Sequence, residues 1–196
     1  MKLAWRQSTC REASYRFSAG KWILLGTICL LVTAASAETL LTREQALKIV
    51  FPRSESVKAE SKVLAPEQRK TLEENTGLRF PEAEYPTFVA TAKGQIDGYA
   101  VILNEIGKHE NITFIVGVSP KGKIIEVAVM EYRESRGGEV KEQRFLSQFR
   151  GKTSSDPVRV NQDIVNYTGA TLSSYAISRG VRRALALIHS FYGAGK

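Results

Sequence analysis

Residues 168–192 read TGATLSSYAISRGVRRALALIHSFY, a small hydroxyl-rich turn followed by a long amphipathic pattern. The apolar side chains recur at helical spacing and predict a helix over Ser174–Tyr192. The turn therefore lies at a helix N-terminus, where free backbone N–H groups and the positive end of the helix dipole favour a phosphate. Taken alone, the turn is equally explained as an ordinary helix cap, for which Ser and Thr are common residues.

Upstream of this helix, the pattern changes to short strands separated by turn residues. The expected strands are residues 88–92, 99–103, 112–118 and 123–130. Short turns, including one at 94–98 and a type I signal at 119–122, make these strands antiparallel neighbours. An apolar sheet face needs a cover. We therefore expect an α+β fold, an antiparallel sheet packed against helices, with a long C-terminal helix as the cover.

The segment before the sheet predicts helices joined by connectors. Thr42 and Gln45 have the capping-box spacing and open a short helix that ends near Val50. A second helix is expected over 65–77, with proline in its first turn and glycine at its end. Residues 53–62 are charged and contain serine, and the acidic stretch 81–86 is bounded by proline, so both are expected to be loops or connectors.

Between the last strand and the opening motif lies a glycine-containing loop. Its residues are Glu134, Ser135, Arg136, Gly137 and Gly138. Paired glycines let a backbone turn tightly and approach a ligand, and arginine suits planar or anionic groups. For this loop alone, a solvated connection is the simpler interpretation. A helix over 139–149 and a short strand at 158–161 are expected to follow.

Residues 1–37 have the pattern of a targeting segment. A basic region ends at Lys21, an apolar run covers 22–32, and Ala35-Ser36-Ala37 offers a cleavage site. We expect a signal peptide or an uncleaved anchor that exports the chain to the periplasm or to the outer face of the inner membrane. The expected organisation is this leader, a helical N-terminal extension at 38–84, and a main domain at 85–196.

Composition excludes several classes of function. Half of the formal net charge of +8 lies in residues 1–37, and the remaining charges are interspersed, so no basic face indicates nucleic acid. Both cysteines, Cys10 and Cys29, lie in the leader, which excludes disulfides and cysteine-ligated metals from the rest of the chain. His109 and His189 are the only histidines, so no metal site and no catalytic triad are predicted.

The motif at 168–174, followed by Val181-Arg182-Arg183-Ala184-Leu185, resembles the FMN-binding domain family. That family includes the G subunit of Rnf electron-transport complexes and the C subunit of Na⁺-translocating NADH:quinone reductase. The resemblance also takes in Gly98-Tyr99-Ala100, the hairpin over 113–129 and the loop at 134–138. It covers most of residues 85–192.

The resemblance implies FMN as the cofactor and no catalytic or metal-binding residue of the chain's own. It implies that a flavin transferase joins FMN through its phosphate to Thr171, and that the loop at 134–138 packs near the flavin. The residues expected to bind the cofactor are Thr168, Gly169, Ala170, Thr171, Leu172, Ser173, Glu134, Ser135, Arg136, Gly137 and Gly138. The family usually has Asp six residues before the modified Thr. Here that position is Val165, and Asp163 lies eight before, a departure that bears on the covalent bond more than on FMN binding.

Three functions are consistent with the sequence. The leading one is an exported FMN-binding electron carrier that passes electrons to or from a membrane electron-transfer complex or another redox partner protein. The alternative, favoured by Val165, is a flavin-free extracytoplasmic module that docks to a membrane complex or senses a ligand. A flavin-dependent reductase with its own substrate is the third, and the absence of an acid/base set counts against it.

Overall fold

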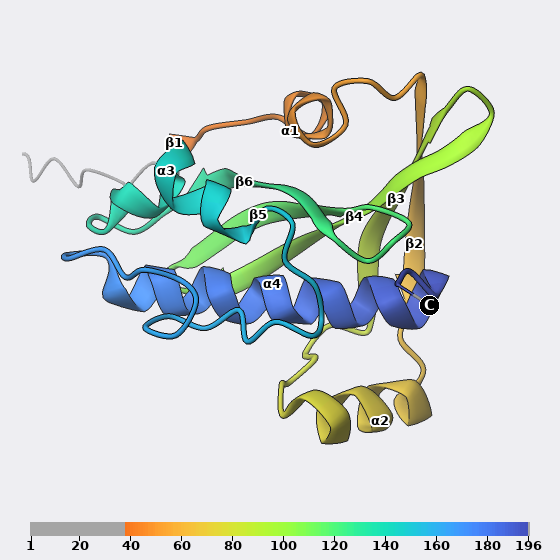
Figure 1. Cartoon of the computed structure of the whole chain (residues 1–196). Helices are drawn as coiled ribbons and strands as arrows, with labels where there is room; N and C mark the ends of the chain where they lie inside the picture. Colours follow the sequence, from red (N-terminus) through yellow and green to blue (C-terminus); the bar gives the residue numbers. More distant parts are fainter. Residues whose placement is uncertain (1–37, 196) are drawn as a thin grey trace, which may run out of the picture. The chain divides into compact units, whose positions relative to one another are not determined.

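The computed structural model describes residues 38–195, so the predicted export segment lies outside the described part (Figure 1). The strands are β1 (Glu38–Thr39), β2 (Ser56–Val63), β3 (Glu84–Ala92), β4 (Gln95–Ile106), β5 (Asn111–Val118) and β6 (Ile124–Tyr132). The helices are α1 (Arg43–Val50), α2 (Pro66–Thr76), α3 (Gln143–Leu146) and α4 (Thr171–Tyr192). Two 3₁₀ turns flank α3, η1 (Gly138–Lys141) and η2 (Ser147–Phe149).

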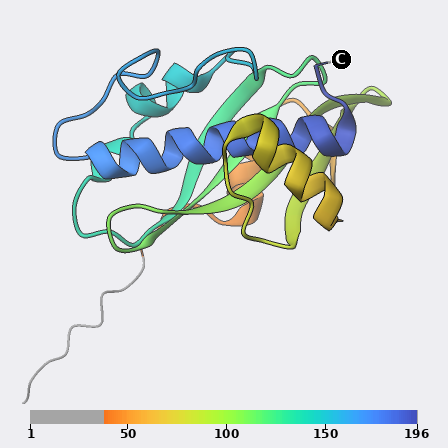
Figure 2. The same ribbon diagram turned by 90° about the horizontal axis from the view of Figure 1, so that it is seen from below.

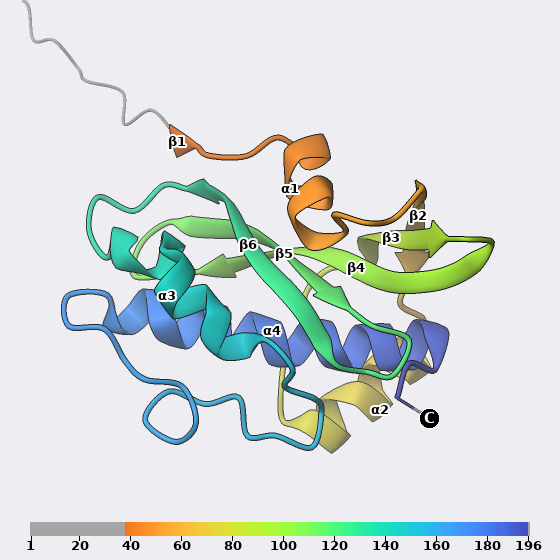
Figure 3. The same cartoon turned by 45° about the horizontal axis from the view of Figure 1, so that its top comes forward.

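The strands form one antiparallel sheet in the order β1-β6-β5-β4-β3-β2. Helix α4 packs against β4 and β5 on one face, and α1 packs against β5 and β6 on the other (Figure 1, Figure 3). Each face has its own apolar cluster, the larger one beneath α4 and the smaller one around Val50, Phe88 and Ile115. The predicted α+β fold with a covering C-terminal helix is confirmed.

Helix α4 lies close to the sheet because its inner stripe is small and apolar. Ile177, Val181, Ala184 and Ile188 are fully buried, as the spacing predicted. At Gly180 an added Cβ would lie 2.4 Å from the ring of Phe114, so only glycine permits this approach. The helix begins at Thr171, a turn earlier than expected, and Thr171 is therefore its first residue rather than part of the preceding loop.

The prediction of a loop at residues 53–62 is wrong, because residues 56–63 form edge strand β2. Each residue of β2 faces one of β3, for example Lys58 opposite Val89. Charged residues protect a sheet edge from pairing with other chains, and the same charges suggested a loop in the sequence. The connector predicted at 81–86 is also too long, since β3 begins at Glu84. The extension at 38–84 thus contributes a strand to the main sheet.

Three other boundaries differ from the predictions. The turn before β4 contains only Lys93 and Gly94, and Gly98 lies inside the strand, where a Cβ would lie 2.7 Å from the Phe51 ring. The helix expected over 139–149 is divided into η1, α3 and η2. The strand expected at 158–161 is reduced to a single bridge between Val160 and Ile164.

Candidate functional site

The loop after β6 and the turn before α4 meet at one open pocket of about 550 Å³. These two segments are more than 30 residues apart in the sequence, and the sheet brings them together. The pocket is lined by Lys108, His109, Glu134, Ser135, Arg136, Gly169, Ala170, Thr171, Leu172 and Ser173. Most of the predicted cofactor-binding residues therefore surround one pocket. Thr168, Gly137 and Gly138 are not among its lining residues.

Gly137 supports the pocket from behind. Its φ is +82°, and an added Cβ would lie 3.2 Å from both the Ala170 Cα and the Ser173 Oγ. The Tyr132 hydroxyl donates to the Arg136 carbonyl at 2.6 Å and lies 3.1 Å from the Ser173 Oγ. The loop after β6 is thus fastened directly to the first turn of α4.

The N-terminus of α4 offers unpaired hydrogen-bond donors to this pocket. Ala170 precedes the helix without a side-chain cap, and the first bond of the helix runs from the Ser174 N–H to the Ala170 carbonyl at 2.8 Å. No described residue accepts from the N–H groups of Thr171, Leu172 or Ser173. Three free N–H groups at the positive end of a 22-residue helix form a site for an anion. The Ser/Thr cap considered for this turn is not what the structure contains.

Thr171 presents its side chain at the exposed entrance of the pocket. Its hydroxyl accepts one hydrogen bond, from the Asn166 side-chain amide at 3.2 Å. The amide oxygen of Asn166 is buried and has no partner in the described part of the chain. The Thr171 hydroxyl is consequently accessible and only weakly held.

The rim of the pocket is basic. Arg136 is exposed and forms no ion pair with any described residue, whereas Arg133 pairs with Glu131 and does not line the pocket. Lys108 and His109 were not predicted as site residues. The turn between β4 and β5 brings them to the pocket, and no pattern within that turn indicates it.

Glu134 lines the pocket, but its carboxylate is engaged within the protein. One oxygen accepts the backbone N–H groups of Lys108, His109 at 2.6 Å and Glu110 at 3.0 Å. Burial alone would raise the pKa of Glu134, but these three donors hold the pKa below its ordinary value. Glu134 therefore holds the turn that carries Lys108 and His109.

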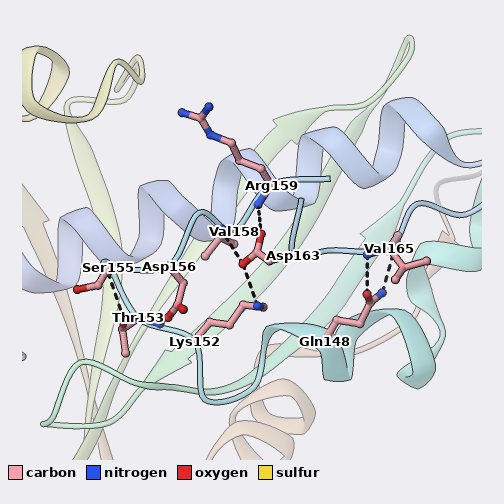
Figure 4. Close-up of polar contacts among 9 residues, drawn as sticks. All are labelled: Gln148, Lys152, Thr153, Ser155, Asp156, Val158, Arg159, Asp163 and Val165. Carbon is pink, nitrogen blue, oxygen red and sulfur yellow. Dashed lines mark hydrogen bonds and ion pairs between the residues drawn. The ribbon is translucent and has the colours of Figure 1, made fainter. Parts of the chain in front are cut away.

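The segment before the motif is held by internal hydrogen bonds (Figure 4). Asp163 accepts from the Lys152 ammonium at 2.8 Å and from the N–H groups of Val158 at 3.1 Å and Arg159 at 2.7 Å. These partners outweigh the effect of burial and lower the pKa of Asp163. Asp163 thus shapes its own loop. Val165, by contrast, is held by its backbone, which bonds to the Gln148 side chain, and its own side chain is 68% exposed.

Two further findings concern residues 38–195 alone. Within them, no three His, Cys, Asp or Glu side chains are grouped so that they could hold a metal ion. No helix of this part is both long and apolar enough to cross a membrane.

Gly137→Ala is expected to separate the two halves of the pocket. The new methyl group would occupy a left-handed conformation and press on Ala170 and Ser173, so we expect about 1–3 kcal/mol of destabilisation and a weaker anion site. Urea unfolding and a phosphate titration followed by NMR test this. Gly138→Ala is the control, since a Cβ there meets only the Lys141 side chain at 3.3 Å. Equal behaviour of the two variants would contradict the assigned role of Gly137.

Comparison with known families identifies the kind of domain. Residues 107–186 match the model of a family described as the FMN-binding domain, and this segment contains every residue that lines the pocket. The chain carries an FMN-binding domain. The predicted resemblance is confirmed, and the match includes the loop at 134–138, the turn at 168–170 and most of α4.

Two curated relatives share this FMN-binding domain. One is the G subunit of a proton-translocating ferredoxin:NAD(+) oxidoreductase complex from Clostridium ljungdahlii, 30% identical over 103 residues, 48% of this chain and 55% of the relative. The other is the G subunit of an ion-translocating oxidoreductase complex from Shewanella baltica, 28% identical over 116 residues, 53% of this chain and 55% of the relative. The chain spans about half the length of each.

Two solved structures share the fold. Shewanella oneidensis NqrC has a TM-score of 0.52 at 16% identity, over 74% of this chain and 86% of that one. The corresponding NqrC-type component of the Na(+)-translocating NADH-quinone reductase from Parabacteroides distasonis has a TM-score of 0.50 at 19% identity, over 77% and 84%. At these identities the likeness establishes the fold alone.

Proposed function

We propose that this protein is an FMN-binding electron-transfer subunit that works with a membrane electron-transport complex of the Rnf or Nqr type. The observation that carries the proposal is the single pocket in which the free N–H groups of α4 meet the loop at 134–138. The relatives named above are subunits of ion-translocating oxidoreductase complexes, which supports the choice of partner.

The residues of the pocket fit the cofactor. The phosphate of FMN would accept hydrogen bonds from the N–H groups of Thr171, Leu172 and Ser173, with the charges of Lys108 and Arg136 beside it. Leu172, 51% exposed, would offer an apolar surface to the ring. FMN, when bound, supplies reversible electron-transfer chemistry, and the protein supplies orientation and electrostatics.

Covalent attachment at Thr171 is part of the proposal. The Thr171 hydroxyl is a weak nucleophile, so a flavin transferase must activate it. The Thr171 oxygen forms the new P–O bond and gives up its proton, while the leaving group departs from the phosphorus of an activated flavin phosphate supplied by the transferase. Support comes from the exposure of this hydroxyl at the pocket entrance. In this step the protein is the substrate.

We also propose an extracytoplasmic location. The targeting pattern of residues 1–37 is the support for export, either by a cleaved signal peptide or by an uncleaved anchor. A tethered cofactor suits such a compartment, because a lost flavin is not easily replaced there.

A titration of the purified chain with FMN tests the function itself. We expect saturable binding with a dissociation constant of about 1 µM or tighter, seen as quenched flavin fluorescence, and competition by inorganic phosphate. Riboflavin, which lacks the phosphate, is the matched control and should bind much more weakly. No binding of FMN would favour the flavin-free docking module, and turnover of a small substrate would favour a reductase.

Arg136→Gln is expected to lower the reduction potential of the bound flavin. The unpaired Arg136 charge faces the pocket and favours the additional negative charge of the reduced cofactor. For a two-electron couple, each tenfold loss of this preference corresponds to about 30 mV. Potentiometric titration measures it. Arg133→Gln is the control, because Arg133 is paired with Glu131 outside the pocket, and equal shifts in both variants would contradict the assignment.

A further inference from the structure

A second ligand site is indicated on the outer side of α4, away from the FMN pocket. Here α4 is flanked by α2 and by the loop of residues 153–162 (Figure 2). Two adjoining hollows of about 370 and 350 Å³ share Leu78, Arg159, Gln162 and Arg182, and together they form what we call the α2–α4 groove. Arg182 is eleven residues from Thr171, about 16 Å along a helix, so the groove is separate from the flavin site.

Two guanidinium groups face this groove without an acidic partner. The Arg159 side chain forms no hydrogen bond or ion pair with any described residue, and it extends away from Asp163 and the rest of its loop (Figure 4). Arg182 is half-buried and donates only to the Thr76 carbonyl, at 3.3 Å. Burial, and next the neighbouring charge of Arg159, lower the pKa of Arg182. The two positive charges therefore repel each other, and an anion between them would relieve the repulsion.

The acids near the groove are already engaged. Asp156 lines it, but its carboxylate accepts from the backbone N–H and the hydroxyl of Thr153, at 2.8 and 2.9 Å. Glu105, which lies near its far end, pairs with Arg179 and Arg183. Neither carboxylate is within ion-pair distance of Arg159 or Arg182, so the positive charge in the groove is not compensated within the described part of the chain.

A buried polar atom gives independent support. Ser178 lines the groove beside the two arginines, is 3% exposed, and its hydroxyl has no hydrogen-bond partner among the described residues. A buried hydroxyl without a partner is costly, and a bound ligand oxygen would satisfy it. The remaining lining is largely apolar and includes Leu78, Pro157, Leu185 and Ala186.

The loop that carries Arg159 is held in a fixed shape. Val158 has φ +46° and Asn161 has φ +65°, and both lie in the left-handed region, which is strained for a β-branched residue such as valine. The bonds of Asp163 to the N–H groups of Val158 and Arg159 hold this conformation. The position of Arg159 is therefore set before any ligand arrives.

We propose that the α2–α4 groove binds a small amphipathic organic anion. Its carboxylate or phosphate group would lie between Arg159 and Arg182, which suit planar oxyanions. Its apolar body would pack against Leu78 and Leu185. The site is independent of FMN, so the proposal stands or falls separately from the proposed electron-transfer function.

NMR titration of the purified chain with phenylbutyrate tests the proposal, with the neutral alcohol phenylbutanol as the matched ligand control. We expect saturable shifts of the amide signals of Gln162, Ser178 and Arg182, equal in FMN-loaded and FMN-free protein, and much weaker binding of the alcohol. Arg159→Gln should weaken phenylbutyrate about tenfold without changing the melting temperature, because Arg159 contacts nothing in the protein. Arg53→Gln, at an exposed arginine without a partner, should bind as the wild type does.

Four results would overturn the proposal: equal affinity for the acid and the alcohol, unchanged affinity in Arg159→Gln, shifts confined to the FMN pocket, or full competition by inorganic phosphate at the same concentration as the acid. Sedimentation with vesicles that contain an anionic phospholipid separates a membrane source of the same chemistry. If Arg159 is needed for vesicle binding while phenylbutyrate does not bind, the groove is a lipid-headgroup site and the proposal is wrong.

Discussion

Thr171→Ala is expected to abolish all flavin that stays attached after denaturation. Thr171 is the first residue of α4, its hydroxyl is exposed, and the hydroxyl has one hydrogen bond, from Asn166 at 3.2 Å. Alanine is a good residue for a helix, and the loss of one exposed bond costs about 1 kcal/mol or less. The variant should therefore fold normally and lose only the atom that would carry the phosphodiester.

Intact-mass measurement in denaturant, after co-expression with a flavin transferase, gives the result directly. Thr168→Ala is the matched control, because Thr168 belongs to the same turn and is exposed but does not line the pocket. The control should keep the mass gain that Thr171→Ala loses. A mass gain in both variants would exclude Thr171 as the anchor, and its loss in both would mean that the transferase recognises the whole turn.

The same experiment separates attachment from binding. The three free N–H groups of α4 remain in Thr171→Ala, since they belong to the backbone. The variant should consequently still bind FMN reversibly, with an affinity within about tenfold of the wild type. If reversible binding also disappears, the hydroxyl contributes to the phosphate site itself. If the wild type binds FMN but never gains mass, Val165 in place of the usual Asp is the first position to examine.

The features that depend on local periodicity are predictable from the sequence. The apolar stripe from Ile177 to Ile188 locates α4 and its buried face, and the capping box at Thr42 locates α1. The same periodicity places the start of α4 three residues late, because Thr171, Leu172 and Ser173 contribute no apolar repeat. Edge strand β2 escapes prediction because its exposed charges have the composition of a loop.

The pocket is predictable only in part, because it is built by contacts distant in sequence. The resemblance indicates both the loop at 134–138 and the motif at 168–171, and the sheet brings them together. Lys108 and His109 reach the pocket because Glu134, about 25 residues later, accepts their backbone N–H groups. Nothing within the turn itself predicts that bond. A buried carboxylate without a basic partner in sequence would have been the only signal.

Glu105→Gln is expected to lower the free energy of unfolding by about 3–5 kcal/mol, the cost of leaving a buried charge without its partner. Glu105 and Arg183 are 3% and 4% exposed, and they form an ion pair between β4 and the inner side of α4. Arg179, partly exposed, bonds to the second oxygen of Glu105 at 2.8 Å. Glutamine keeps the shape of the side chain but removes the charge, so Arg183 stays buried and uncompensated.

Urea unfolding with an unchanged slope measures this loss. Glu142→Gln is the matched control, since Glu142 pairs with Arg144 on the surface and its loss should cost less than about 1 kcal/mol. The double variant Glu105→Leu with Arg183→Met should recover much of the stability, because an apolar pair needs no compensation. Equal effects of Glu105→Gln and Glu142→Gln would show that water reaches Arg183.

The ion pair also bears on the pocket, because Arg179 donates to the Ile106 carbonyl at 3.2 Å, at the end of β4. The next residues are Gly107 and Lys108, and Lys108 lines the pocket. Loss of the Glu105 charge frees Arg179 and loosens this connection between α4 and the turn after β4. At a temperature where both variants are folded, Glu105→Gln should therefore bind FMN more weakly than Glu142→Gln. Equal FMN affinity would limit the ion pair to a role in stability.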